Sequence, residues 1–86
     1  MRFMFPHSHA FRRGRVTVDD DRNAGPECLV EFGDGTTVIA EWRAEDEGVL
    51  RLSIPDYRTA KNTLVAARTW RIAKGEDDAW RSVPLT

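Results

Sequence analysis

The clearest pattern in the chain is a period-two alternation of apolar and polar residues on both sides of a glycine-rich turn. In Glu27–Phe32 the apolar side chains share one face, and they are Cys28, Val30 and Phe32. Residues 33–35 read Gly-Asp-Gly, which tolerates the positive φ angles of a tight turn. The alternation resumes in Thr36–Arg43, where Val38, Ala40 and Trp42 share a face. The pattern predicts a β-hairpin.

Two further segments alternate in the same way and extend the hairpin into a sheet. After an acidic turn at residues 44–48, Val49–Ile54 places Leu50, Leu52 and Ile54 inward, and Pro55 ends the strand. Upstream, Arg13–Val18 predicts a first strand with two valines inward. Residues 19–26 form a polar loop, and residues 1–5 form a short edge strand or stay loose.

The segment from residue 59 to residue 74 carries two conflicting signals. Several good helix formers and a capping Asn62 or Thr63 favour a helix. Against this, Trp70 and Ile72 alternate with polar residues, which favours a strand over Leu64–Ala73. We expect the strand, with one helix at residues 59–74 as the alternative, and a last short strand over Ala79–Val83.

Five or six short strands spaced about ten residues apart predict an all-β fold. We expect a small antiparallel barrel or meander of SH3 or Sm type, because 86 residues are few for an immunoglobulin-type sandwich. An OB-like barrel, or a β-sheet capped by one helix, is the second choice. The length predicts a single domain over residues 1–86, and we expect residues 1–11 to be a flexible N-terminal segment.

A Trp-Arg dipeptide recurs in three of the predicted strands, at residues 42–43, 70–71 and 80–81. Neighbouring residues on a strand point to opposite faces, so tryptophans in the core place the arginines outside. Apolar residues join the arginines on this outer face, and a contiguous patch there marks a partner surface. The candidate partner-binding residues are Leu29, Ile39, Arg43, Val49, Arg51, Arg71 and Arg81.

Charge is segregated along the chain although the net charge is only −1. Residues 1–18 carry four arginines and no acid, whereas residues 19–48 carry ten acids and two arginines. Basic residues near both ends indicate an alternative function, the binding of nucleic acid, although the negative net charge disfavours it. Its candidate residues are Arg12, Arg13, Arg15, Arg58, Lys61, Arg68, Arg71 and Lys74.

Motifs for catalysis are weak. The run Asp19–Asn23 begins like a calcium loop, but Ala24 and Val30 stand where a glycine and a bidentate glutamate belong. The least favoured hypothesis is a metal-dependent enzyme, because nothing in the sequence fixes the distances between its candidate ligands. These ligands are His7, His9, Cys28 and Asp21. We expect Cys28 to be a buried structural thiol and expect no cofactor, metal or small-molecule substrate.

The single cysteine and the lack of a long apolar run predict a cytoplasmic protein without a membrane span. We expect a non-enzymatic binding module. Its partner is another protein or a second copy of this chain.

Overall fold

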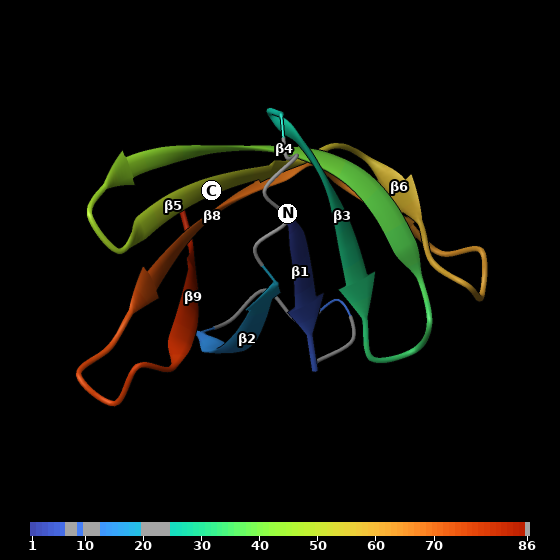
Figure 1. The fold of residues 1–86 in the computed structure, drawn as a ribbon. Coiled ribbons are helices and arrows are strands. Elements are labelled where there is room, and N and C mark those ends of the chain that lie inside the picture. The colour runs from blue at the N-terminus through green and yellow to red at the C-terminus, as the bar shows by residue number, and fades with distance from the viewer. Residues whose placement is uncertain (7–8, 10–12, 20–24, 86) are drawn as a thin grey trace.

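The computed structural model describes residues 1–6, 9, 13–19 and 25–85, and in these residues it contains nine strands and no helix (Figure 1). The strands are β1 (Arg2–Phe5), β2 (Gly14–Asp19), β3 (Glu27–Phe32), β4 (Thr37–Asp46), β5 (Val49–Ile54), β6 (Tyr57–Arg58), β7 (Leu64–Val65), β8 (Arg68–Lys74) and β9 (Trp80–Pro84). Seven of them close into a barrel in the order β1-β2-β9-β8-β5-β4-β3. The prediction of a small all-β barrel is confirmed.

The barrel is closed by β1, whose role the apolar pattern did not define. β1 pairs antiparallel with β2 and parallel with β3, where Phe3 lies opposite Val30. The protein therefore has seven barrel strands rather than five or six, and one of the pairs is parallel. Phe3 is fully buried, and residues 2–5 form one strand of the barrel wall rather than a loose segment or an edge strand.

The predicted meander of β3, β4 and β5 is confirmed, with a longer middle strand. β4 continues through the expected acidic turn to Asp46, with a bulge between Ala44 and Asp46. Gly48, with φ of 70°, completes the short turn into β5. Gly33 permits a close approach at the other hairpin, since a Cβ there would lie 2.5 Å from the carbonyl oxygen of Pro6.

The helix alternative for residues 59–74 is wrong. β6 and β7 form a two-stranded ribbon whose turn contains Asn62 at a φ of 66°, and β8 follows. The alternation explains the outcome, because an extended β8 buries Trp70 and Ile72 together on the barrel interior. The burial of these two side chains outweighs the intrinsic helix propensity of residues 59–74.

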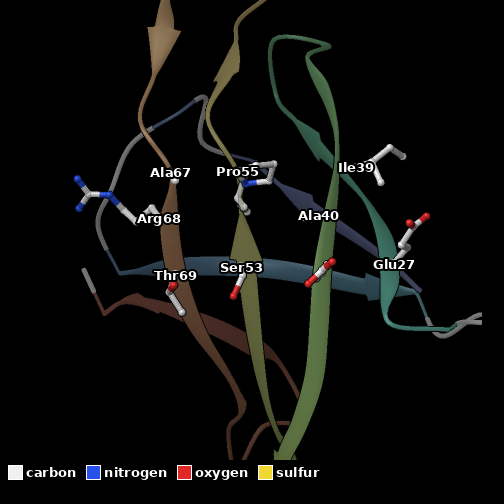
Figure 2. A pocket seen from close by; sticks show the side chains of 10 residues that line it. Glu27, Ile39, Ala40, Ser53, Pro55, Ala67, Arg68 and Thr69 are labelled. Atoms are coloured by element: carbon white, nitrogen blue, oxygen red, sulfur yellow. The ribbon is translucent and has the colours of Figure 1, made fainter.

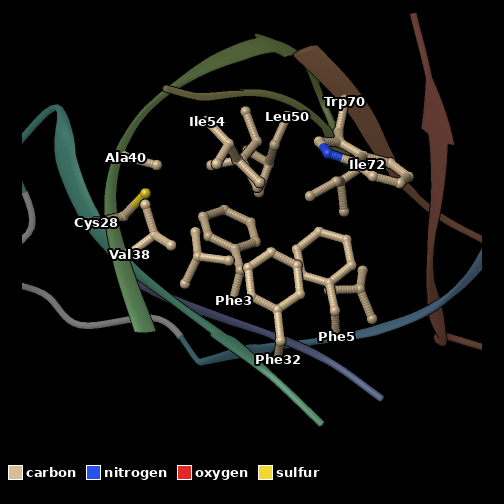
Figure 3. Packing of buried hydrophobic residues seen from close by; sticks show 13 residues of the cluster. Phe3, Phe5, Cys28, Phe32, Val38, Ala40, Leu50, Ile54, Trp70 and Ile72 are labelled. Atoms are coloured by element: carbon tan, nitrogen blue, oxygen red, sulfur yellow. The ribbon is translucent and has the colours of Figure 1, made fainter. Parts of the chain in front are cut away.

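Buried apolar side chains from six of the barrel strands fill the interior (Figure 3), and β9 contributes the buried Ser82. Phe5 packs against Phe32 and Trp70, with ring centroids 5.5 and 5.2 Å apart. The fully or nearly buried cluster is Phe3, Phe5, Val16, Cys28, Val30, Phe32, Val38, Ala40, Leu50, Leu52, Ile54, Trp70 and Ile72. The other two tryptophans, Trp42 and Trp80, are half-buried against it. Apolar side chains from opposite walls of the barrel thus meet in one core.

Candidate functional site

Three of the predicted partner-binding arginines form one row on the outer surface. Arg43 lies directly opposite Arg51 across β4 and β5, and Arg51 lies opposite Arg71 across β5 and β8. Like charges in directly opposed positions of a sheet disfavour the fold. We call these three residues the arginine row.

A single carboxylate within the described residues compensates the arginine row. Arg51 Nη2 donates to Glu45 Oε1 at 2.6 Å, and Arg71 Nε lies 4.0 Å from Glu45 Oε2. The bulge near the end of β4 lies at this glutamate. With the described residues Arg43 makes no ion pair and no side-chain hydrogen bond, and the buried Nε–H of Arg51 has no acceptor. The row therefore keeps an excess of positive charge.

A hollow of about 490 Å³ lies on the same outer surface, across the ends of β3, β4, β5 and β8 (Figure 2). We call it the apolar hollow. Figure 2 shows Ser53 and Thr69 side by side in it, with Glu27 and Ile39 toward one border and Arg68 toward the other. It is lined by Glu27, Ile39, Ala40, Glu41, Ser53, Ile54, Pro55, Ala67, Arg68 and Thr69.

A second hollow of about 440 Å³ adjoins the first, and we call it the arginine hollow. Arg43 and Arg51 line it beside Trp42. Its full lining is Pro26, Glu41, Trp42, Arg43, Arg51, Ser53 and Thr69, of which Glu41, Ser53 and Thr69 also line the apolar hollow. The two hollows form one continuous concave surface.

Local hydrogen bonds explain the position of Trp42 at this surface. The β3–β4 register ends at the pair of Glu27 and Glu41, while β4 continues for five more residues. Beyond the pair, the Trp42 backbone N–H donates to the Pro26 carbonyl at 2.8 Å, and its indole Nε1–H donates to the Gly25 carbonyl at 2.9 Å. These bonds hold the tryptophan half-buried beside the arginine hollow.

The remaining candidate partner residues lie around these hollows in different ways. Leu29 and Ile39 are direct cross-strand partners, and Ile39 is 60% exposed at the edge of the apolar hollow. Val49 and Arg81 line neither hollow. Arg81 lies opposite Arg15 and donates to Asp77 Oδ2 at 2.8 Å.

The structure distributes the candidate nucleic-acid residues over separate places. Arg71 belongs to the arginine row, Arg68 lines the apolar hollow, and Arg15 lies beside Arg81. Arg13 is exposed just before β2, and Arg12 lies outside the described residues. Arg58 and Lys61 belong to the β6–β7 ribbon and its turn, and Lys74 lies over the Trp80 ring near Asp78.

A hydrogen-bonded cluster that the sequence did not reveal lies at the β3–β4 turn. His9 Nδ1 lies 2.7 Å from the Tyr57 hydroxyl, and His9 Nε2 lies 2.7 Å from Asp34 Oδ2. The His9 ring also packs on Phe32 at 4.6 Å. Burial, and to a smaller extent the Asp34 charge, raise the pKa of Tyr57 to about 12. A hydroxyl with so high a pKa stays protonated at neutral pH. The contacts of His9 with Asp34 and Tyr57 join three segments of the chain.

The candidate metal ligands are not brought together in the part of the chain that is described. No group of three His, Cys, Asp or Glu side chains suited to a metal occurs there, and His7 and Asp21 lie outside it. Of the calcium-like run, only Asp19 is described. Cys28 is buried, and this burial raises the pKa of its thiol to about 11, which disfavours the thiolate.

Comparisons of this chain with protein families, with curated proteins and with solved structures find no match. None of the described residues belongs to a helix with the length and apolar character that a membrane crossing requires.

Two of the seven predicted partner residues line the arginine hollow and one lines the apolar hollow. Sequence reasoning missed the shared residues Glu41, Ser53 and Thr69. Their strands and outward faces were predictable from alternation, whereas the concavity depends on the register that brings Ser53 and Thr69 beside Glu41.

Proposed function

We propose that this protein is a non-enzymatic binding module that engages a protein partner through the concave outer surface of β4, β5 and β8. The observation that carries the proposal is the continuity of the two hollows, which share Glu41, Ser53 and Thr69. The short side chains of Ser53 and Thr69 leave room for a ligand between the ends of this surface. An exposed isoleucine and an arginine row at opposite ends offer apolar and charged contacts.

Residue types at this surface match those that contribute to protein interfaces. Tryptophan and arginine are enriched among residues that dominate binding energies, and here Trp42 and Arg43 are sequence neighbours lining one hollow. Arg43 has no ion pair with any residue that the structure describes, so its guanidinium can meet an acceptor on a partner. The cytoplasm is the compartment that we propose for this module, on the basis of its single cysteine.

The test compares two equally exposed aliphatic residues, one at the proposed surface and one on the β6–β7 ribbon outside the barrel. Ile39 is 60% exposed at the apolar hollow, and Leu64 is 61% exposed on the β6–β7 ribbon. We expect Ile39→Glu to weaken association by about tenfold or more, because it places a charge at an apolar contact, and we expect Leu64→Glu to leave association unchanged.

Association is measured as self-association by sedimentation and as capture of a protein partner by the immobilised chain. Loss of either with Ile39→Glu and its retention with Leu64→Glu supports the proposal. A wild-type protein that stays monomeric and captures no protein overturns it, as does an equal effect of the two substitutions.

A further inference from the structure

The chemistry of the surface defines its ligand more narrowly, and this inference rests on the proposed function. We infer that the surface binds an extended peptide segment that carries a carboxylate side chain about four residues from an apolar side chain. The carboxylate lies in the arginine hollow against Arg43, and the apolar side chain lies in the apolar hollow near Ile39.

The charge of the arginine row indicates an acidic ligand. Three guanidinium groups stand in adjoining strand positions, and Glu45 pairs with Arg51 and approaches Arg71. Arg43 has no acidic partner among the described residues, although it lines the hollow. A carboxylate fits there because its two oxygens accept hydrogen bonds from the planar guanidinium fork.

The strand geometry sets the spacing of the ligand. Ile39 and Arg43 are on the same outward face of β4, four residues apart, which corresponds to about 13 Å at roughly 3.3 Å per residue. A segment that lies along the strands spans the same distance with about four extended residues. Between its two ends it passes Glu41, and it lies beside the short side chain of Ser53, which is opposite Glu41 on β5.

Two carboxylates of the surface disfavour a uniformly acidic ligand. Glu27 and Glu41 lie directly opposite each other across β3 and β4; both line the apolar hollow, and Glu41 also lines the arginine hollow. A phosphate backbone carries a charge at every nucleotide and would meet these carboxylates. A peptide with one acidic position and one apolar position satisfies both ends, so we choose the peptide over a nucleic acid.

The experiment uses the full chain labelled with ¹⁵N and three probes. The first is a synthetic peptide with an aspartate and a leucine about four residues apart, following the strand spacing. The second replaces the aspartate by asparagine, and the third is a single-stranded oligothymidylate. We expect the acidic peptide to shift the amide signals of Arg43, Ser53 and Thr69, and to bind about tenfold more tightly than its asparagine counterpart.

Matched variants identify the side chain that binds the carboxylate of the peptide. Arg43→Gln is expected to weaken binding of the acidic peptide by about tenfold and to leave thermal stability unchanged or raised, since it removes a repulsion with Arg51. Lys61→Gln removes an exposed positive charge on the ribbon and is expected to change neither.

Each contrary result has a distinct meaning. Equal binding of the aspartate and asparagine peptides, no binding of either, or an Arg43→Gln variant that binds as the wild type does, overturns the inference. If the peptide results overturn the inference but Ile39→Glu still abolishes association, the proposed function stands without the inference. Tighter binding of the oligothymidylate than of the acidic peptide overturns the inference in favour of a nucleic-acid ligand.

Discussion

At the scale of single residues, burial changes the acid–base behaviour of two side chains that no motif marks. The Cys28 thiol lies in the core, and desolvation raises its pKa from 9.0 to about 11. Tyr57 is half-buried beside Phe32 and His9, and its pKa rises from 10.0 to about 12. In both groups the folded state favours the neutral, protonated form.

These raised pKa values predict a loss of stability in alkaline solution. Above a pH of about 9 the unfolded chain releases protons that the folded chain retains, so the free energy of unfolding falls as the pH rises toward 11 and 12. Urea unfolding at a series of pH values measures this fall. In Cys28→Ala the fall is expected to begin about one pH unit later, where Tyr57 starts to ionise in the unfolded chain. A free energy of unfolding that stays constant or rises over this range would contradict the account.

Alternation in the sequence was enough to predict which way most of these residues point. Cys28, Val30 and Phe32 are buried as expected, and so are Leu50, Leu52 and Ile54. The contact of His9 with Asp34 and Tyr57 was not predictable, because it joins residues 25 and 48 positions apart in the chain. A local pattern carries no information about such a contact.

At the scale of elements, the strands that alternate strictly were predictable and the short ones were not. β3, β4 and β5 follow the pattern over six or more residues each. β1 reads Arg-Phe-Met-Phe, with an apolar Met4 on the face opposite its phenylalanines, and its parallel partner β3 lies 27 residues along the chain. β6 and β7 have two residues each, too few for any period.

The closing strand β1 supplies a test of the barrel. Phe3→Ala removes a fully buried ring that β1 contributes to the barrel core, and it is expected to destabilise the protein by about 3–5 kcal/mol. Met4→Ala, one position along on the other face, is expected to cost clearly less because Met4 is only half-buried. Urea unfolding measures both. Equal and small effects would show that β1 does not close the barrel.

At the scale of the whole molecule, the concave surface results from four segments that are distant in sequence. The two hollows draw residues from β3, from β4, and from the regions of β5 and β8. Their outward direction followed from alternation, and Arg43, Arg51 and Ile39 were predicted as partner residues on that ground. The strand register determines which outward residues become neighbours. The pairing of β4 with β5 and of β5 with β8 places the three arginines in one line.

A photo-reactive amino acid at position 53 tests the central claim most directly, because Ser53 is exposed and lines both hollows. The same group at the exposed position 61, on the ribbon, is the control. We expect position 53 to cross-link to a protein partner or a second copy of the chain, to lose most of that product when Arg43→Gln is added, and position 61 to give no such product. Equal cross-linking from positions 53 and 61, or none from position 53, would contradict a binding function for this surface.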